Sequence, residues 1–366
     1  MKVGILKEAN EARVSIIPDT VKKLVGLGHS CLVETGAGLE SFSSDKDYKA
    51  AGAVVTDRKE VISTVDLLIS ITPIAPNELK NALSHLTQIA LFEPFNAPDR
   101  IKNYAQAQHN AFSLDMIPRI TIAQSMDVLS SMASIAGYKA VLLAANLIPS
   151  YFPMLSTAAG SIPPAKVLIL GAGVAGLQAI ATAKRLGAVV EASDVRAAAK
   201  EEVMSLGGKF IEVEGATDDK GAGGYAVEQS EDFKKRQQAL VQAKAKKADV
   251  IITTAQLRGR PAPTLIPAST VNEMRAGSVI IDLAASTGGN CELSKDNETV
   301  NHNGVRIVGN SNLAALVSSD ASSLFSRNIF NFLKHLTDKE GQFKFDMEDK
   351  ITASALIVKD GKVLGN

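Results

Sequence analysis

The sequence predicts an α/β protein with two doubly wound, parallel-sheet (Rossmann-like) domains, separated by a cleft and joined by long helices. Its 366 residues suffice for two hydrophobic cores. Short apolar runs alternate with amphipathic segments along the first half, which is typical of a doubly wound parallel sheet. A glycine-rich turn between two apolar runs indicates a second sheet. We expect residues 1–125 and 315–366 to form the first domain, and residues 126–314 the second.

The first half contains five apolar runs that predict strands. They are Val3–Leu6, Cys31–Glu34, Leu67–Ile71, Ile89–Glu93 and Ala111–Leu114. Amphipathic segments between them predict helices, most clearly at Asp19–Leu27 and Asp99–Gln108. The nearest approach to a phosphate-binding fingerprint, Gly36-Ala-Gly38, opens no clear helix. This half therefore predicts a sheet without a dinucleotide turn.

A long helix, a linker and a second α/β system follow. The helix is expected over Gln124–Leu147 and ends at Pro149, where a Pro/Ser/Gly-rich linker begins. Beyond the strand that starts at Lys166, the expected strands are Phe210–Val213, Val250–Thr254 and Val279–Leu283. The last helix, Ala321–Leu336, is expected to cross back to the first domain. The polar tail after it is given no function.

The segment KVLILGAGVAGLQAIATAKRLGAVVEASDVR has the order strand, glycine turn, helix, strand and acid that binds dinucleotides. Gly171 permits the tight turn, Gly173 lets the backbone approach a pyrophosphate, and Gly176 lets helix and strand pack closely. The helix N-terminus offers N–H groups to the phosphates. Asp194 can bond both hydroxyls of an adenosine ribose and repels a 2′-phosphate, which favours NAD(H). The predicted cofactor-binding residues of this segment are Gly171, Gly173, Val174, Ala175, Gly176, Asp194, Val195 and Arg196.

Two alternatives stay open for this segment. A turn that merely needs glycines would show the same pattern. Arg196 could instead bind the 2′-phosphate of NADP(H). Because Asp194 lies two residues earlier, we interpret Arg196 as a neighbour that shapes the adenosine pocket.

Three further loops carry candidate cofactor-binding residues. Ligands of open parallel sheets bind beyond the carboxyl ends of the strands. The candidates there are Thr254, Ala255 and Gln256 for the adenosine side, and Asp282 and Leu283, with Gly288, Gly289 and Asn290, for the nicotinamide side. Gly224 and Tyr225, in the glycine-rich insertion Asp218–Glu228, suit a flap that closes over bound cofactor. Hydroxyls and glycines that only satisfy turns, and a plain surface loop, are the alternatives.

Two groups of charged and polar residues belong to the first half. Arg119, Gln124 and Asp127 could face the cleft and hold the nicotinamide carboxamide and the riboses, although Asp127 could equally cap a helix. Lys7 and Glu8 end the first strand, and Arg13 shortly after them could bind a carboxylate substrate or serve as an ion-pair partner.

Composition excludes several classes of function. Lys plus Arg equal Asp plus Glu at 39 each, so nothing indicates a nucleic-acid partner or a polybasic membrane surface. Cys31 and Cys291 lie far apart without metal-ligand spacing, and no metal is expected. The uncharged stretch Ala140–Ala165 is interrupted by Pro and Asn, so we expect no membrane insertion. The N-terminus reads as a strand rather than a signal peptide.

Four segments together resemble one family, the NAD(H)-binding component (domain I) of proton-translocating nicotinamide nucleotide transhydrogenase. They are RITIAQSMDVLSSMASIAGYKAV, GAGVAG with ASDVR, GAGGYA, and IDLAASTGGNCELS. The resemblance implies that Arg119, Gln124 and Asp127 hold the nicotinamide end as the catalytic residues, with Ser130 nearby. It also implies that Gln124 reaches toward a second nucleotide and that Tyr225 lies on a flap that closes on NAD(H).

The resemblance also implies the reaction and the partners. Domain I would present NADH so that hydride passes directly to NADP⁺ held by domain III, and the membrane component, domain II, would couple the exchange to proton translocation. Catalysis is then the positioning of two rings, with no acid–base side chain. The resemblance implies a homodimer, and we expect it in the cytoplasm, peripheral to the inner membrane through its partner subunits.

Two other functions remain as alternatives. An alanine dehydrogenase-like enzyme would share the two-domain architecture, Lys7 and Glu8. It also needs a lysine and a histidine that act on the imino acid, and the matching stretches Leu68–Pro73 and Glu93–Pro98 contain neither. The second alternative is a catalytically silent NAD-binding module, against which only the Arg119–Asp127 loop argues.

Overall fold

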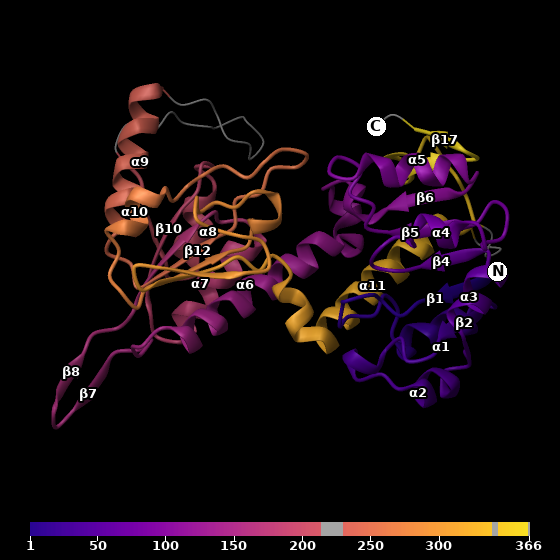
Figure 1. Cartoon of the computed structure of the whole chain (residues 1–366), viewed down its shortest axis with the longest axis horizontal. Coiled ribbons are helices and arrows are strands. Elements are labelled where there is room, and N and C mark those ends of the chain that lie inside the picture. Colours follow the sequence, from indigo (N-terminus) through magenta and orange to yellow (C-terminus); the bar gives the residue numbers. More distant parts are fainter. Residues whose placement is uncertain (214–229, 339–342, 365–366) are drawn as a thin grey trace. The chain divides into compact units, whose positions relative to one another are not determined.

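The computed structural model describes residues 1–213, 230–338 and 343–364 (Figure 1). The chain divides into two compact units, Met1–Met132 with Ala315–Asn366 and Ala133–Ala314. Each unit is built on one large, mostly parallel sheet. The predicted fold class, with parallel-sheet Rossmann-like domains, is therefore confirmed.

The sheet of the first unit has eight strands in the order β17-β16-β6-β5-β4-β1-β2-β3. Their bounds are β1 Lys2–Ile5, β2 Ser30–Glu34, β3 Val54–Thr56, β4 Leu67–Ile69, β5 Thr87–Ala90, β6 Asn110–Ser113, β16 Leu356–Lys359 and β17 Lys362–Val363. The first six strands are parallel, and β16 joins β6 in antiparallel orientation. Strand order reverses between β1 and β4, so this is where an open sheet of this kind accepts ligands.

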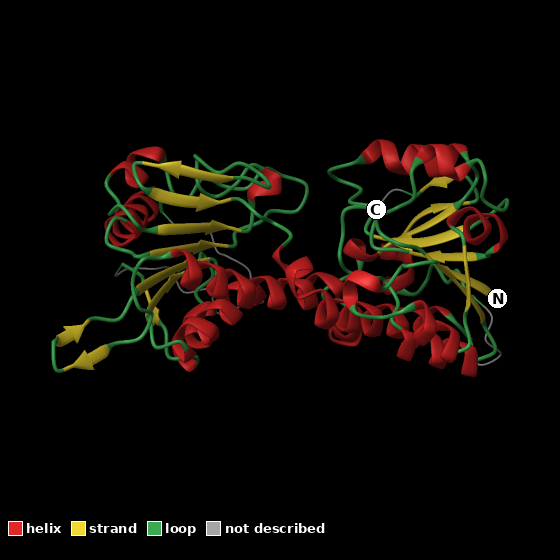
Figure 2. Ribbon diagram, turned by 60° about the horizontal axis from the view of Figure 1, so that its bottom comes forward, coloured by secondary structure: helices red, strands yellow, loops and turns green. Residues whose placement is uncertain are grey.

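Helices cover both faces of the first sheet (Figure 2). They are α1 Pro18–Gly26, α2 Asp45–Ala50, α3 Arg58–Thr64, α4 Pro76–Leu79, α5 Pro98–Gln106, α11 Ser318–Leu336 and α12 Lys350–Ala355. Alternate strand residues enter two cores: Leu67 and Ile69 pack in one, and Leu68 packs in the other. The apolar face of α11 covers the first core with Phe325 and Phe332. Both faces of the strands are thus buried, which explains their continuous apolar runs.

The sheet of the second unit has the order β11-β10-β9-β12-β13-β15-β14. Its strands are β9 Lys166–Leu170, β10 Val189–Ser193, β11 Lys209–Phe210, β12 Val250–Thr253, β13 Val279–Asp282, β14 Thr299–His302 and β15 Val305–Val308. All are parallel except β14, which is antiparallel to β15. The order reverses between β9 and β12, so the loops after these two strands border the place where a ligand binds.

The helices of the second unit include the one that follows the glycine turn. They are α7 Val174–Arg185, α8 Ala199–Ser205, α9 Glu231–Ala245 and α10 Ala268–Asn272. The helix α6, Val128–Leu147, begins in the first unit and continues into the second. Its length and apolar composition would also suit a membrane span. Because Ala140, Val141 and Ala144 are fully buried in the second core, we interpret α6 as a core helix.

Three elements differ from their predictions. The helix expected from Gln124 begins only at Val128, after a separate 3₁₀ helix over Thr121–Met126, because the backbone at Asp127 is extended. The linker contains a hairpin of β7 Leu155–Thr157 and β8 Gly160–Ile162 that pairs with neither large sheet. The tail after Leu336 is not featureless, since the buried run Leu356-Ile357-Val358 adds β16 to the first sheet.

Candidate functional site

The glycine turn after β9 is shaped by close backbone contacts. Gly171 has a φ of +99°, a conformation that strains any residue with a side chain. A Cβ at Gly176 would lie 1.8 Å from the carbonyl oxygen of Gly171. At Gly173, by contrast, no described atom lies within 4 Å of the Cβ position. Gly176 is therefore required for packing, whereas Gly173 leaves room for a ligand that approaches the backbone.

The N-terminus of α7 follows this turn directly. The first N–H groups of a helix have no partners within it, so they can bond an anion. A second glycine brings α6 against this turn, because a Cβ at Gly137 would lie 2.1 Å from the carbonyl oxygen of Ala175. The sequence interpretation missed Gly137, although an isolated glycine inside a helical pattern is the signal for such an approach.

Asp194 and Arg196 form a closed arrangement at the end of β10. Oδ2 of Asp194 accepts from the N–H of Ala172 at 2.7 Å, and Oδ1 accepts from the N–H of Arg196 at 2.8 Å. The Arg196 side chain donates from Nε to Oδ1 at 3.0 Å and from Nη2 to Oδ2 at 3.1 Å. Nη2 also donates to the carbonyl oxygen of Ala172 at 3.1 Å. The predicted ribose acid therefore touches the glycine turn itself.

These contacts keep Asp194 ionised. Burial of its carboxyl would raise the pKa, but hydrogen bonds from the side chain and backbone of Arg196 and from the backbone of Ala172 outweigh burial and lower it. The carboxylate repels a phosphate and accepts hydroxyl groups. Val195 is 81% exposed beside it and supplies apolar surface to the same edge.

The loops after β12 and β13 are bound to the glycine turn and to each other. Oγ1 of Thr254 donates to the carbonyl oxygen of Gly171 at 3.0 Å. The amide of Asn290 accepts from the N–H of Ala255 and donates to its carbonyl oxygen, both at 2.9 Å. Gln256 donates to the carbonyl oxygen of Leu283 at 2.8 Å. The predicted residues Thr254, Ala255, Gln256 and Leu283 thus belong to one connected edge.

Asp282 organises the loop after β13 from inside. Its side chain is fully buried and accepts from five donors, namely the hydroxyls of Thr253 and Ser294 and the N–H groups of Ala284, Asn290 and Cys291. A carboxylate has about four lone-pair sites, so no acceptor position is left. Asp282 can therefore support a cofactor through the loop it shapes rather than through its carboxylate.

In the first unit, Asp127 begins α6 as its N-cap. Its carboxylate accepts from the N–H of Ser130 at 2.9 Å and from the Ser130 hydroxyl at 2.6 Å. The two predicted residues therefore lie side by side. Arg119 and Gln124 are exposed in and before the 3₁₀ helix Thr121–Met126. Exposed polar side chains on a short, well-held segment are available to a ligand or a partner.

Two asparagines of α11 hold that 3₁₀ helix in place. Nδ2 of Asn328 donates to the carbonyl oxygen of Ser125 at 2.8 Å, and Nδ2 of Asn331 donates to the same oxygen at 3.0 Å. The sequence interpretation missed both residues, because they follow Ser125 by about two hundred positions and carry no motif. The neighbour of Gln124 is thereby fixed from the C-terminal segment of the first unit.

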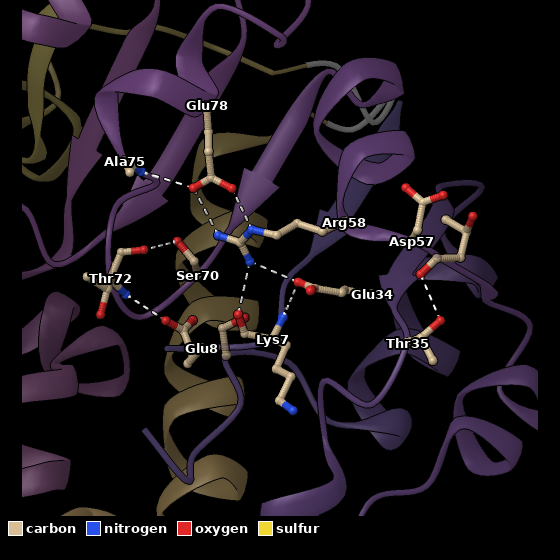
Figure 3. A network of polar contacts seen from close by, with 12 residues as sticks. Lys7, Glu8, Glu34, Thr35, Asp57, Arg58, Ser70, Thr72, Ala75 and Glu78 are labelled. Atoms are coloured by element: carbon tan, nitrogen blue, oxygen red, sulfur yellow. Dashed lines mark hydrogen bonds and ion pairs between the residues drawn. The ribbon is translucent and has the colours of Figure 1, made fainter. Parts of the chain in front are cut away.

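The residues after β1 form a separate polar network (Figure 3). Glu8 is buried and accepts from the N–H groups of Ile71 at 2.5 Å and Thr72 at 3.1 Å. Burial, only partly offset by these bonds, raises the pKa of Glu8 to about 7. Arg13 forms an ion pair with Glu11 at 2.6 Å and is itself buried, which favours the structural alternative for this arginine.

The structure thus gathers the predicted residues into two groups. The glycine turn, Asp194, Arg196 and the loops after β12 and β13 lie in the second unit, whereas Arg119, Gln124, Asp127 and Ser130 lie in the first. Gly224 and Tyr225, the predicted flap residues, lie outside the described residues. Among the described residues no group of His, Cys, Asp and Glu could hold a metal ion.

The fold and the glycine turn define a dinucleotide-binding α/β protein of the dehydrogenase class. Two family descriptions match the chain: "Alanine dehydrogenase/PNT, N-terminal domain" over residues 4–136 and "Alanine dehydrogenase/PNT, C-terminal domain" over residues 140–366. The chain belongs to this alanine dehydrogenase/PNT family.

Transhydrogenases stand out among its relatives. The first of the separate alpha-subunit chains of NAD(P) transhydrogenase from Rhodospirillum rubrum is 44% identical over 100% of this chain and 98% of its own length. The same subunit of Rickettsia prowazekii is 40% identical over 100% and 96%. The crystal structure of transhydrogenase from Sinorhizobium meliloti superposes with a TM-score of 0.91 at 41% identity, covering 99% of this chain and 100% of that one.

Alanine dehydrogenase is a more distant relative. A solved L-alanine dehydrogenase shares the fold at a TM-score of 0.82 and 24% identity, covering 100% of this chain and 97% of that one. The resemblance to the transhydrogenase component is thus confirmed, and the family implies NAD(H) as the cofactor.

Proposed function

We propose that the chain binds NAD(H) and presents it for direct hydride transfer to NADP⁺ on a second transhydrogenase component. The observation that carries the proposal is the joint presence of the glycine turn with Asp194 and the Arg119–Ser130 segment in a chain that is similar to transhydrogenase alpha subunits along its whole length. Either feature alone would suit many dinucleotide-binding proteins.

The residues of the second unit fit the adenosine and pyrophosphate of NAD(H). The open side of Gly173 and the N-terminus of α7 would receive the pyrophosphate. Asp194 would bond the adenosine ribose beside Val195, and Thr254–Gln256 would border the same edge. When bound, the nicotinamide ring supplies the hydride chemistry, and the chain supplies binding and orientation.

The polar segment of the first unit would bind the nicotinamide end. Arg119, Asp127 and Ser130 would orient the carboxamide and its ribose, and Gln124 would reach toward the second nucleotide. Support comes from the exposure of Arg119 and Gln124 and from the firm seating of Ser125 by Asn328 and Asn331. Such positioning brings two rings to reacting distance without an acid–base group.

The partners would be an NADP(H)-binding component, domain III, and a membrane component, domain II, that couples the exchange to proton translocation. The chain would lie in the cytoplasm, attached to the inner membrane through them. We also propose a homodimer, supported by the hairpin β7–β8, whose flanking Met154 and Ile162 are 66% and 41% exposed. Light scattering on the purified chain checks the dimer.

Stopped-flow mixing of the chain with a purified NADP(H)-binding component tests the main proposal. Hydride transfer from NADH to bound NADP⁺ that occurs only in the mixture supports it. NADH binding without transfer, to a component shown to react with its own cognate subunit, contradicts it and favours the silent NAD-binding module. Alanine-dependent reduction of NAD⁺ by the chain alone would favour the alanine dehydrogenase alternative.

A further inference from the structure

The acid–arginine contact at Asp194 has a counterpart in the first unit. At the end of β2, Glu34 accepts from the N–H of Lys7 at 2.8 Å and from Nη1 of Arg58 at 2.9 Å. Nη1 of Arg58 also donates to the carbonyl oxygen of Lys7 at 3.1 Å (Figure 3). In both units an acid after the second strand, an arginine, and the backbone just after the first strand therefore bond one another. We call this arrangement the acid–arginine bracket.

The two brackets differ in how firmly the arginine is held. Arg58 is fixed by a second acid, because its Nε and Nη2 donate to the carboxylate of Glu78 at 2.6 and 3.2 Å. Among the residues that the structure describes, Arg196 forms an ion pair with Asp194 alone, and its side chain is 36% exposed. The bracket of the second unit can thus open by movement of one side chain, whereas that of the first unit cannot.

The acceptor positions of Asp194 are all in use. Its two oxygens receive the N–H groups of Ala172 and Arg196 from the backbone and two N–H groups from the Arg196 side chain. A carboxylate offers about four such positions. A ribose can bond Asp194 only if donors leave, and the side chain of Arg196 supplies the two donors that leave without moving the backbone.

We propose that the two hydroxyls of the adenosine ribose replace the two side-chain donors of Arg196 on Asp194, so that Arg196 is a releasable latch on the ribose subsite. The exchange keeps the number of hydrogen bonds to the carboxylate unchanged. A sugar with only one free hydroxyl leaves one acceptor of Asp194 unpaired, so the latch selects for the diol. This inference rests on the proposed function, because it takes NAD(H) as the ligand.

Binding of two probes to the variant Arg196→Leu tests the latch. NADH must displace Arg196, whereas reduced nicotinamide mononucleotide has no adenosine ribose and need not. We expect the dissociation constant of NADH, measured by fluorescence titration, to fall roughly 3- to 10-fold, in keeping with the loss of a partly exposed ion pair. The dissociation constant of the mononucleotide should stay unchanged. Arg275→Leu removes another arginine–aspartate pair of the second unit, with Asp249, and should change neither.

Weaker or unchanged NADH binding in Arg196→Leu, or an equal shift for both probes, overturns the latch. Arg196→Lys serves if the leucine variant does not fold: lysine keeps the charge without the two-pronged geometry, and NADH should again bind more tightly, by a smaller factor. Failure of the unmodified chain to bind NADH would contradict the proposed function itself, and is distinct from a latch that does not open.

Discussion

Asp194 is the residue on which the choice between the two dinucleotides depends. Replacing it with alanine removes the acceptors for the ribose diol and the charge that repels a 2′-phosphate, and it frees the guanidinium of Arg196. We expect Asp194→Ala to weaken NADH binding about 10-fold or more, since hydrogen bonds to charged groups contribute about 1.5–3 kcal/mol. NADPH should lose much less affinity, so that discrimination narrows.

Fluorescence titration with both nucleotides checks this expectation. Glu191→Gln provides the control, because Glu191 lies on β10 but pairs with Lys244 at 2.6 Å, away from the glycine turn. An unchanged ratio of the two dissociation constants in Asp194→Ala would show that the acid does not set the preference.

Glu8 makes the stability of the chain depend on pH. Its pKa is raised from 4.5 to about 7, chiefly by burial. Between these values the folded chain binds more protons than the unfolded chain, so the free energy of unfolding falls as the pH rises through this window. Urea unfolding at pH 5 and pH 8 should show a decrease of about 2–3 kcal/mol that is absent in Glu8→Gln, whose amide does not titrate. Parallel pH profiles of the two proteins would contradict it.

At the level of single residues the sequence predicts chemistry better than contacts. The spacing of Gly171 and Asp194 is a local pattern, and it is sufficient to propose a dinucleotide turn. The pairing of Asp194 with Arg196, the burial of Asp282 and the support of Ser125 by Asn328 depend on side-chain geometry across the fold. No pattern along the chain encodes these contacts.

The packing of α6 against the first turn of α7 is a property of two elements, and it depends on Gly137. A Cβ there would lie 2.1 Å from a backbone oxygen, so one helix must move. We expect Gly137→Ala to lower the free energy of unfolding by about 1–3 kcal/mol, as overpacking does. NADH binding should weaken as well, because the displaced turn carries the phosphate-binding N–H groups.

Urea unfolding and NADH titration of the variant measure the two effects. Gly26→Ala is the matched control: Gly26 ends α1 in helical conformation, and no described atom lies within 4 Å of its Cβ position. The control should change neither quantity appreciably. Equal behaviour of the two variants would show that the approach of α6 to α7 tolerates a methyl group.

The elements themselves follow closely from apolar periodicity where a strand is buried on both faces. The runs at β1, β2, β9, β12 and β13 agree with their predicted strands to within a residue or two. Prediction fails where a local cap or a short pairing decides the outcome. Asp127 interrupts a continuous helical pattern, and β11 keeps only Lys209–Phe210 of a longer apolar run.

For the whole molecule, strand–helix alternation is enough to predict two parallel sheets, because short crossovers leave few other topologies. It cannot predict that β16 and β17 complete the first sheet. Their apolar run is short, and its partner β6 lies more than two hundred residues earlier. Contacts between segments so far apart are decided by which sheet edge is left uncovered, and this is visible only in the folded chain.

Gln124 tests whether the chain acts within a larger assembly. Its side chain is exposed beside the carbonyl oxygen of Ser125 that α11 holds, so shortening it should not disturb the fold. We expect Gln124→Asn to bind NADH with nearly unchanged affinity but to transfer hydride to NADP⁺ on the second component about 10-fold or more slowly, because misplacement by about an ångström lowers the rate steeply.

Stopped-flow transfer with excess partner component, alongside NADH titration, separates the two effects. Ser130→Ala is a useful comparison, since it removes a hydroxyl bonded to Asp127 and should weaken NADH binding as well as transfer. A normal transfer rate in Gln124→Asn would place the junction of the two nucleotides elsewhere. A loss of NADH affinity equal to the loss of rate would make Gln124 a cofactor-binding residue only, and the exposed face of its 3₁₀ helix would then need no second component to explain it.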